Sequence, residues 1–173
     1  QFLLEVAGAE AETFLNETFV ADMTKVAPGR GVYGGILNEA GGFIDDVITY
    51  RPAQDLFWVV PAPHRVDRVE AYLKERGKSY GVHVVSLGYR YVSLSLQGPQ
   101  SRACLERVTN QDVSTEGLPG FGVVKATVAG IDDVILTRTG FTGELGYELW
   151  VPTEHIESFY DTLLESGKSL GLV

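Results

Sequence analysis

An α+β fold with largely antiparallel sheets and single packing helices is predicted by this sequence of 173 residues. Short apolar runs are separated by turn residues, which is typical of hairpins and not of long crossovers. Helical periodicity appears singly between groups of strands, unlike the regular alternation of a doubly wound fold. The repeated strand–helix–strand groups predict two lobes, although no convincing sequence repeat relates them.

The first half of the chain opens in a strand-like run, QFLLEVAG, and continues into a helix with one apolar stripe. Two strands joined by NEAGG follow, because asparagine and glycine are hairpin-turn residues. A second helix begins near Pro63, since proline fits the first turn of a helix. The helical stripe consists of Ala11, Phe14, Leu15 and Phe19. The expected strands cover residues 32 to 37, 43 to 50, 56 to 60 and 82 to 87.

The second half of the chain shows the same mixture of strands and single helices. Pro99 opens a short helix, and the last helix follows the i, i+3, i+4 rule most clearly. Its apolar positions are Ile156, Phe159, Tyr160, Leu163 and Leu164. The strands are expected around residues 89 to 98, 123 to 130, 133 to 140 and 147 to 152.

Composition narrows the class of protein. The formal charge of −9, without a basic run, argues against sequence-independent binding of nucleic acid. The chain has no apolar run of membrane-spanning length, so no membrane partner is expected. A single cysteine, Cys104, excludes an intrachain disulfide and favours a cytoplasmic or other intracellular compartment. The chain lacks a start methionine and stops directly after a helix, which predicts an excerpt of a longer polypeptide missing N- and C-terminal parts.

Several familiar motifs are set aside. GRGVYG at residues 29 to 34 matches the dinucleotide pattern, but a helix precedes it and a strand follows, the reverse of what that motif requires. His64, His83 and His155 have no ligand-like spacing to one another or to Cys104, so no metal site is predicted. Cys104 lies in an apolar helix and is interpreted as a small core residue.

Two adjacent acids stand in the strand-like run GGFIDDVITY, residues 41 to 50. Alternate residues of a strand share a face, so Asp46 is grouped with Ile44, Ile48 and Tyr50. This set is the more apolar one, which makes Asp46 the expected inward acid. A carboxylate in such surroundings must be hydrogen-bonded or protonated, as is common at functional sites. The alternative is that Asp45 and Asp46 both lie on a solvated hairpin.

The stretch RTGFTGELGYELWVP, residues 138 to 152, combines glycines with an acid inside a strand. Gly140, Gly143 and Gly146 allow tight turns or a close approach of the backbone to a ligand, and Glu148 follows them. The alternative is a glycine-rich hairpin with a glutamate on an edge strand.

These stretches, together with YGGILNEAGGFIDDVITY and LQGPQSRACLERV, resemble the folate-binding region of the aminomethyltransferases of the glycine cleavage system, the T-proteins. The motifs occur in the family's order, and the resemblance covers essentially residues 1 to 173 as one folate-binding domain. The resemblance implies a T-protein-type fold and an aminomethyltransferase-like transferase.

Position by position, the resemblance assigns the family's key aspartate, its catalytic residue, to Asp46. It also implies that Glu148 hydrogen-bonds the pterin ring, that Tyr33 and Phe141 line the folate pocket, and that Val59 lies in a strand that walls it. The implied reaction passes the aminomethyl group of a lipoyl carrier protein to tetrahydrofolate, which is the nucleophile. The products are methylenetetrahydrofolate and ammonia, and no metal takes part.

The sequence departs from the family pattern in two places. Phe141 keeps the ring of the family's second pocket tyrosine but lacks its hydroxyl, and Pro61 replaces a common asparagine and removes an amide. Three functions therefore remain open: an aminomethyltransferase, the folate module of a sarcosine- or dimethylglycine-type dehydrogenase or tetrahydrofolate-dependent demethylase, and a non-catalytic folate-binding module. An iron–sulfur-associated branch is set aside because GFTGELGYE contains no cysteine.

Overall fold

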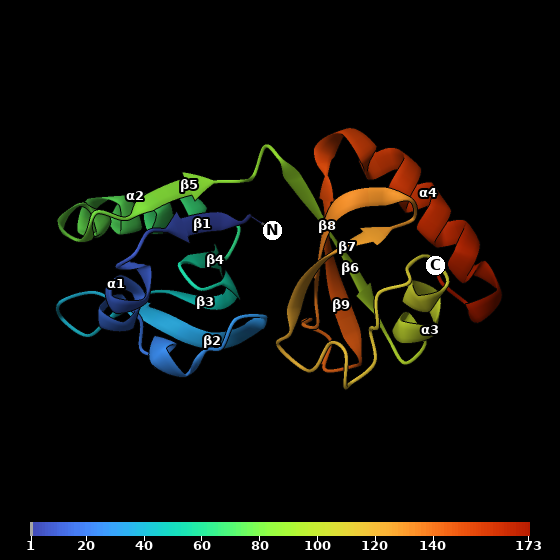
Figure 1. Cartoon of the computed structure of the whole chain (residues 1–173), viewed down its shortest axis with the longest axis horizontal. Coiled ribbons are helices and arrows are strands. Elements are labelled where there is room, and N and C mark those ends of the chain that lie inside the picture. The colour runs from blue at the N-terminus through green and yellow to red at the C-terminus, as the bar shows by residue number, and fades with distance from the viewer. Residues whose placement is uncertain (1) are drawn as a thin grey trace. The chain divides into compact units, whose positions relative to one another are not determined.

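The computed structural model describes residues 2–173 and divides the chain into two compact units, one ending at Tyr89 and the other running from Arg90 to Val173 (Figure 1). Each unit is built from one antiparallel sheet with its own helices. The α+β class and the two lobes predicted from the sequence are therefore confirmed. Within residues 2–173, no helix is both long and apolar enough to cross a membrane.

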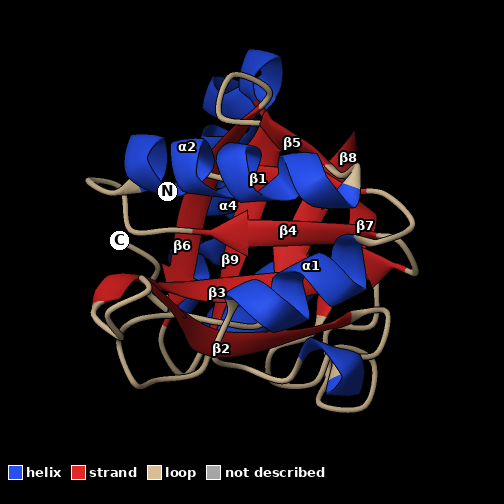
Figure 2. Ribbon diagram, turned by 90° about the vertical axis from the view of Figure 1, so that its left-hand side faces the viewer, coloured by secondary structure: helices blue, strands red, loops and turns tan. Residues whose placement is uncertain are grey.

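The first unit is a five-stranded sheet in the order β2-β3-β4-β1-β5, which can be followed in Figure 2. All neighbouring strands run antiparallel. The strands are β1 (Leu4–Ala7), β2 (Arg30–Leu37), β3 (Phe43–Ala53), β4 (Leu56–Val60) and β5 (His83–Ser86). The helices are α1 (Ala11–Thr18) and α2 (Val66–Gly77).

The helices of the first unit pack on one face of its sheet. Phe14 and Leu15 of α1 and Leu73 of α2 are fully buried in a cluster that also contains Val47 of β3 and Val59 of β4. Each such side chain stabilises the fold by about 1.5–3 kcal/mol relative to exposure. The apolar stripe predicted for the first helix is therefore confirmed as its core face.

The β2–β3 hairpin turns at NEAGG, as predicted. The Asn38 side chain accepts hydrogen bonds from the amides of Ala40 and Gly42 at 3.0 and 2.9 Å. Gly41 has a φ of +78°, in the left-handed region that glycine enters without a steric penalty. This turn sets where β3 begins, and with it the register that places the two acids.

The second unit is a four-stranded antiparallel sheet in the order β6-β9-β8-β7. Leu149 of β9 and Phe159 of the last helix are fully buried in its core cluster. Tyr160 was expected on the apolar face of that helix, but it is 48% exposed, so this expectation is corrected. The strands are β6 (Tyr91–Gln97), β7 (Val123–Val128), β8 (Ile131–Thr137) and β9 (Gly146–Pro152). The helices are α3 (Ser101–Glu106) and α4 (Ile156–Gly167).

The two units share one topology, which the sequence alone did not reveal. Each begins with a strand and a helix, continues with three strands and adds a second helix; β2-β3-β4-β1 corresponds to β7-β8-β9-β6. In both units Gly-Lys-Ser ends the second helix and starts a 3₁₀ turn. Gly81 and Gly171 then end the turns with φ values of +64° and +80°. The repeated strand–helix–strand groups expected from the sequence are thus seen as a repeated topology, to which the first unit adds β5.

Candidate functional site

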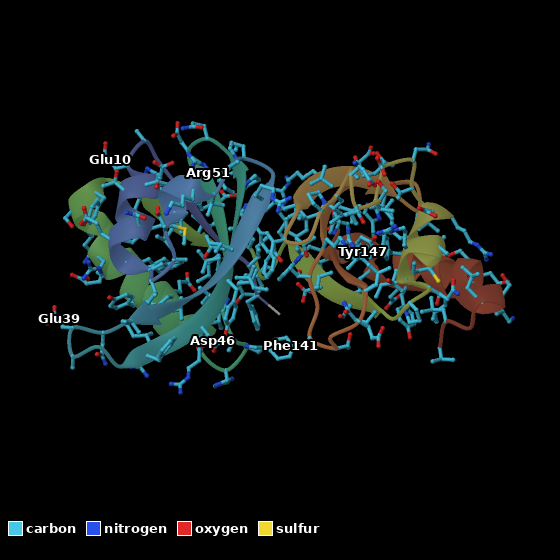
Figure 3. The ribbon with its side chains drawn as sticks, turned by 90° about the horizontal axis from the view of Figure 1, so that it is seen from below. Glu10, Glu39, Asp46, Arg51, Phe141 and Tyr147 are labelled. Carbon is cyan, nitrogen blue, oxygen red and sulfur yellow. The ribbon has the colours of Figure 1, made fainter. Side chains whose placement is uncertain are left out.

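Tyr33 and Asp46 lie on one face of the β2–β3 ladder, the face opposite the helices. Directly opposed residues of antiparallel strands share a face, and Tyr33 pairs with Ile48 while Gly35 pairs with Asp46. The alternate residue Val47 belongs to the helix-packed core. Figure 3 labels Asp46 on this unit. The structure thus brings these two residues of the predicted site together on adjacent strands.

The glycines of RGVYGG make room for aromatic rings on this same face. A Cβ atom on Gly31 would lie 2.5 Å from Cδ1 of Tyr50, and one on Gly35 would lie 2.2 Å from Cε1 of Phe43. Both rings therefore rest against the β2 backbone, on either side of Tyr33. Gly31, which belongs to the motif that resembles a nucleotide-binding pattern, and Gly35, which directly follows that motif, serve instead as platforms for rings.

The expectation that Asp46 is the inward acid is wrong. Asp45 is the buried one, 6% exposed, and its Oδ2 accepts a hydrogen bond of 2.9 Å from the amide of Ala62. Asp46 is exposed. The register passes from Ile36 opposite Asp45 to Leu37 opposite Phe43, so a bulge at Ile44 turns that side chain toward the core. Strict alternation of side chains from Ile44 onward therefore assigned Asp46 to the core face, which is wrong.

The solvated-hairpin alternative fails as well, because Asp45 is buried and Asp46 has a specific partner. The Tyr33 hydroxyl donates to Asp46 Oδ2 at 2.9 Å. This hydrogen bond, together with the charge of the carboxylate, raises the pKa of Tyr33 above its ordinary value. Tyr33 is therefore a protonated donor at neutral pH and orients the carboxylate. A carboxylate has acceptor positions on both oxygens, so Asp46 can serve a ligand while Tyr33 holds it.

The side chain of Val59 lies on the opposite face of the sheet from those of Tyr33 and Asp46. It is fully buried in the helix-packed core and pairs with Leu4 and Thr49 in the middle of the sheet. Because Val59 and Asp46 have opposite parity, only the backbone of β4 at Val59 is available to wall a pocket on the face of Asp46, and that role stays a prediction. Pro61 follows directly after β4 and is buried.

Glu148 is a buried carboxylate in the second unit. It is 4% exposed, and Thr139 donates to its Oε2 at 2.6 Å. The Thr137 hydroxyl lies 3.1 Å from that of Thr139, which extends the polar cluster. Glu148 belongs to β9, which lies between β6 and β8, so the edge-strand alternative is wrong. Its neighbours Tyr147 and Leu149 point into the core, so Glu148 occupies the opposite face.

The glycine-rich loop before β9 is tied down by Gln97, a residue that sequence reasoning missed. A Cβ atom on Gly140 or Gly146 would lie 1.9 Å from Gln97 Oε1. The Gln97 amide donates to the carbonyls of Thr139 and Tyr147 at 3.3 and 3.2 Å. Gln97 thereby fixes the strand that carries Glu148. The absence of a side chain at Gly140 and Gly146 was the sequence signal that could have indicated the contact with Gln97.

Phe141 projects from this loop and is 96% exposed (Figure 3). Its ring has the freedom to contact a ligand, in contrast to the buried rings of the second unit. Cys104 is buried in the core, as predicted. Over the described residues 2–173, no group of three or more His, Cys, Asp or Glu side chains is placed to hold a metal ion.

Comparison with known proteins gives this geometry a context. Residues 3–173 match the family model described as the GCVT N-terminal domain. An aminomethyltransferase from Herpetosiphon aurantiacus is 35% identical over 162 residues, which cover 94% of this chain and 44% of that protein. The chain thus spans less than half the length of this curated relative.

Two solved structures share the fold. The glycine cleavage system aminomethyltransferase T from Bartonella henselae matches with a TM-score of 0.83 and 29% identity, over 94% of this chain and 43% of the other. Heterotetrameric sarcosine oxidase from Corynebacterium sp. U-96 matches with a TM-score of 0.70 and 17% identity, over 99% of this chain and 82% of the other. The second likeness is one of fold alone.

Proposed function

The chain belongs to the GCVT N-terminal domain family, and from this premise we propose that it provides the folate-binding part of an aminomethyltransferase, acting in tetrahydrofolate-dependent one-carbon transfer. The observation that carries the proposal is its similarity, over nearly the whole chain, to proteins named aminomethyltransferase. The two oriented carboxylates supply a chemical basis for the binding of folate.

Reduced pterins present several N–H groups, and carboxylate oxygens accept hydrogen bonds from such groups. Glu148, oriented by Thr139, is proposed to grip the donor edge of the pterin. Such a charge-assisted hydrogen bond contributes about 1.5–3 kcal/mol. Asp46, oriented by Tyr33, is proposed to accept a hydrogen bond near the reacting nitrogens and to stabilise the positive charge that develops there. Tyr33 and Phe141 are proposed to provide ring contacts.

The proposed reaction needs no nucleophile from the protein. The two reacting nitrogens of tetrahydrofolate form bonds to the methylene carbon. The bonds that join this carbon to the amine nitrogen and to the lipoyl sulfur break. The two protons lost by the folate nitrogens end on ammonia and on the lipoyl thiol, so atoms and charges balance. A lipoyl carrier protein is therefore the proposed protein partner, and tetrahydrofolate the second substrate.

Titration of the full chain with tetrahydrofolate, followed by an assay with an aminomethyl-lipoyl carrier, tests the proposal. We expect saturable binding, ammonia release and formation of methylenetetrahydrofolate. Binding without transfer from the carrier would instead favour a demethylating enzyme's folate module or a non-catalytic binding module. Failure to bind tetrahydrofolate would overturn the proposed function altogether.

Glu148→Gln provides the site-specific test. It preserves side-chain shape but removes the charge, so we expect tetrahydrofolate affinity to fall about 10- to 100-fold, or about 1.4–2.7 kcal/mol. The matched control Glu157→Gln changes an exposed acid on α4 and should leave affinity unchanged. A structural role for Glu148 would instead lower the melting temperature at unaltered affinity, and that result would remove it from the site.

A further inference from the structure

Phe43 is a large apolar side chain left mostly in water, and neither its sequence position nor the family resemblance accounts for it. Its ring is 67% exposed on the first unit. The ring nevertheless lies against the neighbouring strand: a Cβ atom on Gly35 would lie 2.2, 2.9 and 3.1 Å from Cε1, Cζ and Cδ1 of Phe43. One side of the ring therefore covers the Gly35 backbone, and the outer side faces solvent.

The ring lies beside Asp46. Gly35 is the residue directly opposite Asp46 in the β2–β3 ladder, and the Cβ direction of Gly35, which the Phe43 ring occupies, points to the same face as the Asp46 side chain. Tyr33 stands two residues before Gly35 on that face, 59% exposed, with its hydroxyl on the same carboxylate. Two exposed rings thus flank one oriented acid.

We infer that Phe43 is a further ligand-positioning residue, whose outer ring face packs against a flat ring of the bound folate while Asp46 accepts a hydrogen bond. This inference rests on the proposed function and adds to it a contact that the resemblance does not assign. If Phe43 served only to cover Gly35, the inner side of its ring would be sufficient. The exposed outer face of the ring would then have no role. Pterin and aminobenzoyl rings share the chemistry of the contact, because both offer flat faces for stacking.

The test measures affinity of the full chain for tetrahydrofolate and for a tetrahydropterin that lacks the aminobenzoyl group. We expect Phe43→Ala to weaken binding about threefold to tenfold, the scale of an aromatic contact. Phe43→Tyr, which retains the ring, should stay within about twofold of the original protein. The control Tyr160→Ala removes a ring that is 48% exposed on α4 and should have no effect on affinity.

The outcomes separate the two ligand rings and the two hypotheses. A loss with both compounds places Phe43 against the pterin, and a loss with tetrahydrofolate alone places it against the aminobenzoyl ring. Unchanged affinity of Phe43→Ala for both compounds overturns the inference while the proposed function stands. Failure of the unaltered protein to bind overturns both. If Phe43→Ala unfolds, Gly35→Ala is used, since its methyl group displaces the ring; unchanged affinity in that folded variant also overturns the inference.

Discussion

Neighbouring residues of one strand can have opposite environments and opposite roles. Asp45 is buried and bonds the amide of Ala62, whereas Asp46 is exposed and bonds the hydroxyl of Tyr33. The first contact holds the chain after β4 against β3. The second leaves a charged group oriented on an accessible face, which is the arrangement that ligand binding requires.

Substitution of Asp46 should affect the reaction and not the fold. Asp46→Asn keeps size and an acceptor oxygen but removes the charge, so turnover should fall by about 10²-fold, the scale typical of lost acid–base or electrostatic assistance. Because the side chain is exposed, the melting temperature should hardly change. Steady-state kinetics of the full chain with the lipoyl carrier would measure this. Turnover equal to that of the unaltered protein would reject a role for Asp46.

The matched variant Asp45→Ala should show the reverse pattern. It leaves the partly buried amide of Ala62 without its acceptor, at a cost of about 1–3 kcal/mol in the free energy of unfolding. Turnover per folded molecule should change by less than about threefold, since Asp45 faces away from Asp46. Chemical denaturation and kinetics on the same samples distinguish the two acids. Equal kinetic losses in both variants would contradict the assignment.

At the scale of elements, glycines create space for the side chains of neighbouring strands. Gly31 and Gly35 of β2 admit rings from β3, and Gly146 of β9 admits Gln97 from β6. In each case a Cβ atom would overlap a side chain across the ladder. The function of these glycines is therefore close packing between strands, which explains why three of them are tolerated inside strands that they weaken.

Gly146→Ala should lower the free energy of unfolding by about 1–2 kcal/mol, because its methyl group displaces Gln97 from two backbone carbonyls. In a Gln97→Ala background the same change should be neutral or stabilising, since alanine suits a strand better than glycine. Urea denaturation of the unaltered protein, the two single variants and the double variant completes this double-mutant cycle. Gly120→Ala, where no atom lies within 4 Å of the new Cβ, is the control. Additive effects would refute the packing explanation.

At the scale of the whole molecule, we expect the free energy of unfolding to depend on pH through an ionic cluster in the second unit. Asp133 of β8 accepts hydrogen bonds from Lys125 of β7 at 2.6 Å, from Arg90 at 2.8 Å and from Tyr91 of β6 at 2.5 Å. Burial disfavours the charged form of Asp133, but these donors and the charge of Lys125 outweigh it and lower its pKa. Burial and the bond to Asp133 raise the pKa of Tyr91.

The sign of the pH effect follows from the lowered pKa of Asp133. The unfolded chain binds a proton at higher pH than the folded chain does, so the cluster stabilises the fold fully above the unfolded pKa, near 4. That contribution is lost as the pH falls through the folded pKa. Melting temperatures between pH 7 and pH 3 should therefore fall more for the unaltered protein than for Asp133→Asn. Asparagine tolerates the φ of +62° at this position. Parallel curves would contradict the prediction.

The sequence by itself determined the elements and the class of fold. Apolar periodicity and turn residues act over a few neighbouring positions, so the stripe of α1, the NEAGG turn and the strands were all predictable. The order of motifs likewise determined the family. It singled out Tyr33, Asp46, Phe141 and Glu148, whose roles toward folate remain predictions.

Only the tertiary structure decided which side chains share a face and which are buried. Both faces of β3 are apolar, because rings cover the β2 glycines on one side and helices cover the other, so composition could not distinguish Asp45 from Asp46. A bulge at Ile44 then shifted the alternation. Pairing between distant segments likewise decides the burial of Val59, the hydrogen bonds from Gln97 to the loop before β9 and the shared topology of the units. Short-range periodicity does not encode such pairing.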